Sequence, residues 1–111
     1  MNMENNSANP NTIQLEARLF NGFADCSRLA ILKSLIDKEK SVSEVVEIAG
    51  LSQPNVSAHL SCLKECGLVQ LRQDGRQVIY SLADEKIAEL IILGQSILKH
   101  TANTILACTR Y

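Results

Sequence analysis

No run of apolar residues in this chain reaches the roughly 18 that a membrane helix needs, so a membrane-spanning protein is not expected. The first residues, "MNMENNSANPN", contain no basic region followed by an apolar run, which argues against a signal peptide. We therefore expect a cytoplasmic location, and we interpret residues 1–11 as a disordered N-terminal tail.

The chain also lacks an excess of basic charge, because 11 Lys and Arg stand against 12 Asp and Glu. No global field indicates nucleic-acid binding, although a local basic stripe would be enough for it. Internal repeats and low-complexity segments are absent from the sequence as well. The 111 residues, 46% hydrophobic and 21% charged, predict one small globular domain whose modest core favours help from a second subunit.

The motifs of common enzymes are missing too. We find no nucleophile–base pair, phosphate-binding loop or carboxylate dyad, so an enzyme is not expected. Cysteine, by contrast, occurs four times. Without an export signal these thiols should stay reduced, and thiols that are close in sequence favour metal or redox chemistry.

The hydrophobic spacing predicts helices in the first half of the chain. Apolar residues four apart indicate a helix over 13–23, and Asp25 or Ser27 is expected to cap the next one. A short third helix begins at Ser41 or Ser43 and stops at Gly50.

The second half combines a helix, a hairpin and a long final helix. Ser52 is expected to cap the helix 53–66, and the pair Asp74-Gly75 predicts a hairpin between two strands. The final helix, over 85–106, is apolar on more than one face, so it needs cover on more than one side. A second subunit would provide that cover.

Two adjacent helices joined by a tight turn and followed by a hairpin are typical of a winged helix-turn-helix. We therefore predict a mostly α fold with a β-hairpin wing that forms a homodimer through the helices 13–23 and 85–106. The domain is expected over 12–107 and is followed by a C-terminal tail, 108–111.

The helix 53–66 has the features of a DNA-reading helix. Val56, Leu60 and Leu63 share one face and are expected in the core. Short polar side chains on the other faces suit base edges and phosphates, and arginines on a wing suit a minor groove or phosphates. Alternatively, the polar residues of the helix are only a solvated face, and the arginines of the hairpin only increase solubility. The neighbouring helix and hairpin of a helix-turn-helix favour DNA binding over both alternatives. The predicted DNA contacts are Gln53, Asn55, Ser57, Ala58, Ser61, Lys64, Arg72 and Arg76.

Two of the cysteines, Cys62 and Cys66, lie four residues apart on this helix. Their Cβ atoms are expected about 5–6 Å apart, at a spacing that allows two thiolates to hold one metal ion. The helix C-terminus disfavours a thiolate at Cys66, so a thiol that ionises only with metal is expected there. Cys108 is the natural third ligand, whereas Cys26 is expected either to be buried or to serve as a fourth thiol.

Three stretches, "ADCSRLAILKSL", "LSQPNVSAHLSCLKECGLV" and "GRQVIYSL", resemble the ArsR/SmtB family of metal-sensing repressors. Within that family, "SCLKECGLV" resembles the cadmium- and lead-sensing branch, which uses two cysteines of the reading helix and one of the C-terminal tail. The resemblance implies Cys62, Cys66 and Cys108 as ligands, with the tail cysteine from the other subunit. It also implies a dimer that binds operator double-stranded DNA without metal and controls metal resistance or efflux genes.

Other metal sites of the family are not expected in this chain. Ser41 and Ser43 stand where one such site has cysteines, and Lys86 and Ile97 occupy the middle positions of another. Cys26 stands where the family usually has proline.

An all-sulfur site favours soft ions, so Cd(II) or Pb(II) is the expected effector and Zn(II) is less suitable. As(III) also accepts three sulfurs, so an As(III)-responsive repressor is an alternative. A thiol-redox-responsive regulator that oxidises Cys62 and Cys66 is another, although a helix would strain that disulfide. The least specific alternative is a protein-interaction module whose cysteines merely pack.

Overall fold

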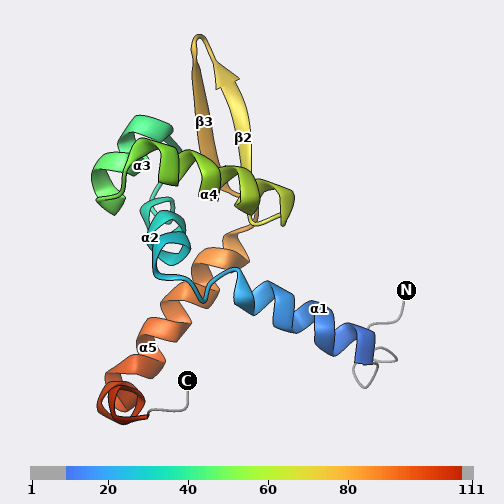
Figure 1. The fold of residues 1–111 in the computed structure, drawn as a ribbon, viewed down its shortest axis with the longest axis vertical. Helices are drawn as coiled ribbons and strands as arrows, with labels where there is room; N and C mark the ends of the chain where they lie inside the picture. Colours follow the sequence, from blue (N-terminus) through green and yellow to red (C-terminus); the bar gives the residue numbers. More distant parts are fainter. Residues whose placement is uncertain (1–9, 109–111) are drawn as a thin grey trace.

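The computed structural model describes residues 10–108 and contains five helices and a three-stranded sheet in that range. The arrangement is a winged helix-turn-helix, as the sequence predicted (Figure 1). In chain order the elements are α1 (Pro10–Asn21), α2 (Cys26–Ser34), β1 (Lys40–Ser41), α3 (Val42–Ala49), α4 (Gln53–Glu65), β2 (Val69–Asp74), β3 (Gln77–Leu82) and α5 (Glu85–Ala107).

Side-chain caps fix where the helices begin. Asp25, rather than Ser27, accepts a hydrogen bond from the Arg28 amide at the start of α2. Ser41, rather than Ser43, caps α3 in a reciprocal capping box. Ser52 caps α4 as predicted. Each cap satisfies a backbone amide that would otherwise lack an intrahelical partner.

The predicted tails correspond only partly to the structure. Helix α1 begins at Pro10, so it includes the last two residues of the expected N-terminal tail. Residues 1–9 lie outside the described range, as do 109–111 of the expected C-terminal tail. Cys108 is described and forms the C-cap of α5.

The wing is the antiparallel pair β2–β3, which carries the short strand β1 on its other side in the order β1-β3-β2. Asp74 pairs with Gln77, so the two-residue loop consists of Gly75 and Arg76, one residue later than the Asp74-Gly75 signal suggested. Gly75 has a φ of 62° at the first loop position, the feature of a type II′ turn. No sequence pattern indicated the two-residue strand β1.

The core lies between α2, α3, α4, the first turns of α5 and the base of the wing. Val56, Leu60 and Leu63 of α4 are buried in it, which confirms the predicted inner face of this helix. The polar residues of α4 therefore point outward.

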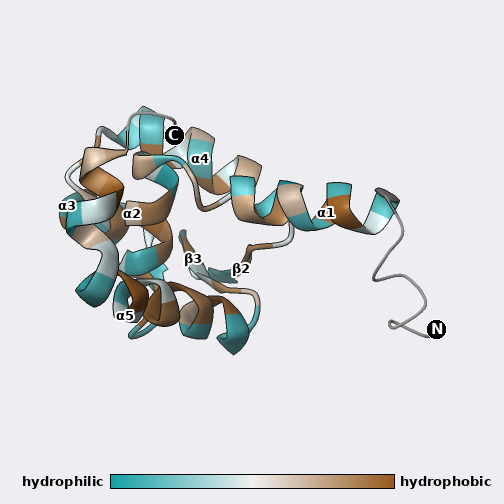
Figure 2. Cartoon of the chain, turned by 90° about the horizontal axis from the view of Figure 1, so that it is seen from below, coloured by the Kyte–Doolittle hydropathy of each residue, from teal (hydrophilic) through white to brown (hydrophobic). Residues whose placement is uncertain are grey.

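Helices α1 and α5 extend away from this core, on the side opposite the wing (Figure 1). The radius of gyration is 15.8 Å, above the roughly 13 Å expected for a compact domain of this length. Figure 2 shows apolar residues along α5 and on parts of α1. The large exposed apolar side chains on these two helices are Ile13, Leu15, Leu19, Phe20, Ile92, Leu93, Ile97, Leu98, Ile105 and Leu106.

A groove of about 380 Å³ runs between these helices and the start of the core. Phe20, Phe23, Leu29, Leu90 and Leu98 are among its lining residues. Within residues 10–108, none of the helices combines the length and the apolar character needed to cross a membrane.

Candidate nucleic-acid interface and thiol pair

The outward face of α4 carries the side chains predicted to contact DNA. They are exposed, while the opposite face of the helix is buried in the core. Figure 1 shows α4 lying across the base of the wing, away from the free ends of α1 and α5. The reading helix and the wing therefore occupy one end of the molecule, as groove binding requires. The exposed residues of this face are Gln53, Asn55, Ser57, Ala58, Ser61 and Lys64.

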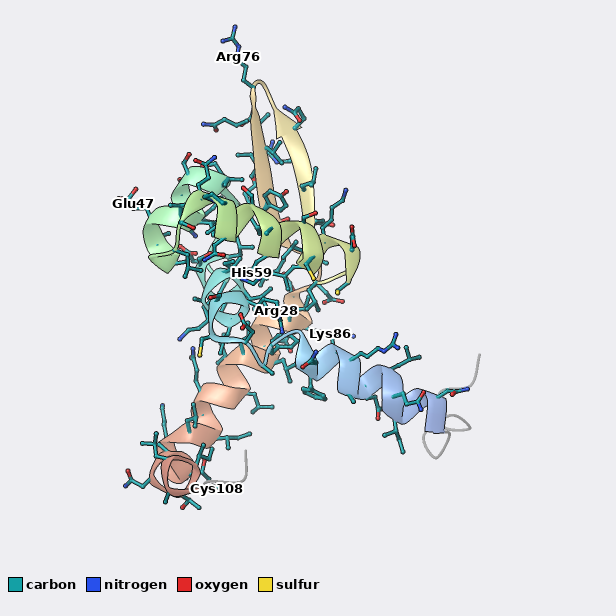
Figure 3. The ribbon with its side chains drawn as sticks, in the orientation of Figure 1. Arg28, Glu47, His59, Arg76, Lys86 and Cys108 are labelled. Carbon is teal, nitrogen blue, oxygen red and sulfur yellow. The ribbon has the colours of Figure 1, made fainter. Side chains whose placement is uncertain are left out.

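The two wing arginines are in different environments. Arg76 lies in the loop at the tip of the wing, and its side chain points away from the protein (Figure 3). Arg72 lies along β2 and donates two hydrogen bonds, both of 2.9 Å, to the Glu39 carboxylate. Glu39 precedes β1 and was not identified from the sequence, since nothing local connects residues 33 positions apart.

Cys62 and Cys66 lie together at the end of α4. The Cys66 amide donates to the Cys62 carbonyl at 3.0 Å, as in a regular helical turn, so the two side chains lie one turn apart on the same side of the helix. Both side chains are exposed, beside the core face rather than on it.

The surroundings of Cys66 keep its thiol protonated. Desolvation is the largest cause that raises the pKa of Cys66, followed by the adjacent Cys62 and by Glu65. The charge of Arg28 acts in the opposite direction but is the smallest of these effects. A raised pKa does not suit an activated nucleophile, but it allows a thiol to ionise on binding metal.

The other two cysteines lie apart from this pair. Cys108 caps the C-terminal end of α5, far from α4 in the same chain (Figure 3). Cys26, one of whose expected environments was the core, is exposed as the first residue of α2. In the described part of the chain, no three His, Cys, Asp or Glu side chains gather closely enough to hold a metal.

The donor set of one chain thus fits a soft metal only in part. The adjacent thiols of Cys62 and Cys66 supply two sulfur ligands of suitable chemistry. All four cysteines lie within the described residues, so a site with three thiolates requires Cys26 or Cys108 to approach this pair, from the same chain or from a second subunit.

Comparisons with known proteins agree with this architecture. Residues 25–70 match the family described as "Bacterial regulatory protein, arsR family". The chain is 43% identical over 94 residues to the "Probable mercury resistance operon repressor" of Streptomyces lividans, covering 85% of this chain and 75% of that protein. It is 44% identical over 75 residues to the HTH-type transcriptional regulator CmtR of Mycobacterium tuberculosis, covering 68% of this chain and 64% of the relative.

Solved structures with the same fold include a homodimer. The homodimeric winged helix-turn-helix DNA-binding domain of a Mycobacterium bovis protein superimposes with a TM-score of 0.76 at 28% identity. That match covers 88% of this chain and 91% of the domain. A crystal structure of an M. tuberculosis protein gives a TM-score of 0.78 at 33% identity, covering 90% of this chain and all of that one. The two sequence relatives are named as transcriptional regulators, which agrees with the expectation that this chain is not an enzyme.

Proposed function

The chain belongs to the ArsR family of bacterial regulatory proteins, and from this premise we propose that it is a metal-responsive repressor. In the metal-free state a homodimer binds operator double-stranded DNA and blocks transcription of metal resistance or efflux genes. When a soft thiophilic ion binds the homodimer, the homodimer is released from the operator. Because a repressor acts on chromosomal DNA, the proposal includes a cytoplasmic location.

The observation that carries this proposal is the position of the thiol pair. Cys62 and Cys66 are adjacent and exposed on the same helix that presents the polar face. Two thiolates on a reading helix have no use in base recognition, where amides, hydroxyls and guanidinium groups predominate. Their chemistry suits a soft cation, and their place on α4 gives that cation direct influence on DNA binding.

The proposed ligands are Cys62, Cys66 and Cys108. Since Cys108 lies far from the pair within one chain, we propose that the Cys108 of a second subunit completes the site. Three thiolates suit Cd(II) or Pb(II), while As(III) and Zn(II) are less favoured candidates. The thiolates are formed as the ion binds, because the pKa of Cys66 is raised.

For DNA binding, we propose that the exposed residues of α4 enter the major groove and that Arg76 contacts the phosphates or a minor groove. Arg72 is already bound to Glu39, so its proposed role is to hold the wing in position. Two-fold symmetry then predicts a partly palindromic operator with half-sites about one helical turn apart.

A titration tests the proposal. An operator duplex is first selected from random-sequence DNA, and the labelled complex is then titrated with Cd(II), Pb(II), Zn(II), As(III) or Hg(II). We expect thiolate-to-metal absorption and a loosening of DNA by about 5–150-fold, the usual range of allosteric coupling. The matched control is Cys62→Ser/Cys66→Ser, which should bind operator but not respond. Release by peroxide but by no metal would instead establish a thiol-redox regulator.

A second effector, Hg(II), is favoured by one observation. Only two thiols lie together within the described residues, and two thiolates suffice for a linear Hg(II) complex. A relative is named as a mercury resistance operon repressor. If Hg(II) is the effector, its response should survive Cys108→Ser, whereas a response to Cd(II) should not.

A further inference from the structure

The wing is packed against the rest of the protein at its base. Of the six residues of β2, Val69 alone is buried, and no residue from Gln73 to Val78 is buried. Figure 1 shows the paired strands β2 and β3 projecting beyond α4. The contacts at the base therefore set the direction in which the wing tip and Arg76 point.

Strand β1 forms the edge of this base. It pairs with β3 through Lys40–Tyr80 and Ser41–Ile79. Tyr80 is also the partner of Leu71 in β2, so Lys40, Tyr80 and Leu71 form one row across the three strands. Paired residues point to the same face of a sheet, so the Lys40 side chain lies on the face where Tyr80 packs against the core.

Lys40 is unusual in this row because it is a lysine that is only 3% exposed. Its Nζ donates to a carboxylate oxygen of Asp37 at 2.5 Å and to the Lys38 carbonyl at 3.3 Å. The Asp37 side chain is itself 69% exposed. The buried lysine thus closes the turn of residues 37–40, whose other side chains are exposed to solvent.

Stability alone does not account for a lysine at this position. Removing an ammonium group from water is costly, and an exposed carboxylate offsets that cost only in part because water screens it. Replacing a buried charge by an apolar side chain of similar volume is often neutral or stabilising. A methionine would fill the same space, but it could not donate to two oxygens and so hold the turn in one shape.

The turn that Lys40 closes also contains Glu39. The Glu39 carboxylate accepts both hydrogen bonds of Arg72 from β2. One turn therefore connects a buried side chain with an exposed side chain of the wing. A change in the shape of the turn moves Glu39, and with it Arg72 and the strand that carries it.

We propose that Lys40 is a positioning residue: by closing the turn 37–40, it fixes the direction of the wing for operator binding. This inference rests on the proposed function, in which Arg76 contacts DNA. From Leu71 to the tip the strands extend about 10 Å, at roughly 3.3 Å per residue. A tilt of about 20° at the base therefore moves the tip by about 3–4 Å, which is enough to break a hydrogen bond to DNA.

The test compares wild type with Lys40→Met and with the matched control Lys38→Met, which removes the charge of an exposed side chain in the same turn. Residual dipolar couplings of the backbone amides report the direction of β2 and β3 relative to α4 in the full chain. Fluorescence anisotropy measures operator affinity in these proteins and in the Arg76→Gln background. Circular dichroism measures their melting temperatures.

In wild type and Lys38→Met, one alignment should account for the couplings of both α4 and the wing. In Lys40→Met the couplings of the wing should depart from that alignment, while the melting temperature should not fall. Operator affinity should fall about tenfold, the loss expected for one charge-assisted hydrogen bond. In the Arg76→Gln background Lys40→Met should lower the affinity little further, because the contact at the wing tip is already absent.

Wild-type couplings in Lys40→Met would overturn the inference, whatever its melting temperature. Altered couplings together with wild-type operator affinity would overturn the link between Lys40 and DNA binding. A wild type for which no operator can be selected would refute the proposed function instead, and the couplings would still decide whether Lys40 fixes the wing.

Asp37→Ala provides a second variant, which serves if Lys40→Met does not fold. It removes the exposed acceptor of the Lys40 ammonium and leaves the packing of the core unchanged. We expect the couplings of the wing to depart from those of α4 in this variant too. Unaltered couplings in folded Asp37→Ala would contradict a role of the ion pair in directing the wing.

Discussion

The Arg72 guanidinium and the Glu39 carboxylate form a two-pronged ion pair, with Nε and Nη2 each 2.9 Å from a carboxylate oxygen. The pair ties the wing to the segment before β1. Its hydrogen bonds hold the pKa of Glu39 below its usual range, so the pair is present at neutral pH and is lost as the pH falls through that lowered value. Exposed ion pairs usually contribute little to stability, but two-pronged geometry restricts orientation. We therefore infer that this ion pair fixes the orientation of the wing relative to the segment before β1.

The salt dependence of operator binding should separate the two wing arginines. Each phosphate contact contributes about 0.9 to the slope of log affinity against log salt concentration. Arg76→Gln should lower that slope by about this amount, because Arg76 lies free of such a pair at the wing tip. Arg72→Gln should leave it nearly unchanged. A drop of similar size in both variants would mean that Arg72 leaves Glu39 to contact a phosphate.

A charge exchange extends this comparison. Arg72→Glu alone should weaken operator binding, since it places two carboxylates face to face and displaces the wing. Glu39→Arg combined with Arg72→Glu re-forms the pair in reverse and should restore most of the affinity. Fluorescence anisotropy with one operator duplex measures all the variants. If the double variant binds as weakly as Arg72→Glu, the wing needs the positive charge of Arg72 itself.

Binding of Cd(II) should strengthen as the pH rises. Because desolvation and Cys62 raise the pKa of Cys66, this thiol holds its proton at neutral pH and must release it to become a ligand. Below that pKa, each released proton makes the apparent affinity increase about tenfold per pH unit. Chelator competition across the neutral range measures the slope, and Cys66→Ser should reduce it by about one proton. A pH-independent affinity in wild type would contradict protonated thiols in the metal-free protein.

Local patterns in the sequence predicted most of the fold. The caps Asp25, Ser41 and Ser52 and the buried face of α4 depend on neighbours within a few residues, and such signals can be read directly. The adjacency of Cys62 and Cys66 also follows from helical spacing. The structure confirms each of these features. They could be predicted because none of them needs a distant residue to form.

Features that depend on tertiary packing could not be predicted in this way. Strand β1 exists only because two residues pair with β3, and Glu39 meets Arg72 across 33 residues of chain. The hydrogen bonds of Arg28 at the end of α1 have no local signature either. The third metal ligand remains a prediction, because it depends on a subunit contact that one chain does not contain.

The exposed apolar side chains of α5 predict a dimer that a single charge should disrupt. Ile97 is 54% exposed on α5, and Ile48 is 58% exposed on α3, outside the proposed interface. Ile97→Glu should yield monomers at micromolar concentration and weaken operator binding, because a carboxylate would be buried between subunits. Ile48→Glu is the matched control and should remain dimeric. Sedimentation velocity distinguishes the two outcomes, and a dimeric Ile97→Glu would remove α5 from the interface.

Cys108→Ser should leave repression intact while abolishing most of the response to Cd(II), since this residue lies away from the reading helix. Mixed dimers then determine which subunit supplies the third thiolate. One subunit carries Cys108→Ser and the other carries Cys62→Ser/Cys66→Ser, with different affinity tags for purification. If Cys108 binds across the dimer, the mixed dimer contains one complete site and should bind one equivalent of Cd(II) with wild-type absorption. If Cys108 binds within its own chain, no complete site remains, and the absorption should fall to that of Cys62 and Cys66 alone, as in the Cys108→Ser homodimer. Because the two arrangements predict different spectra from the same purified species, absorption equal to that of the Cys108→Ser pair would refute a site shared between subunits.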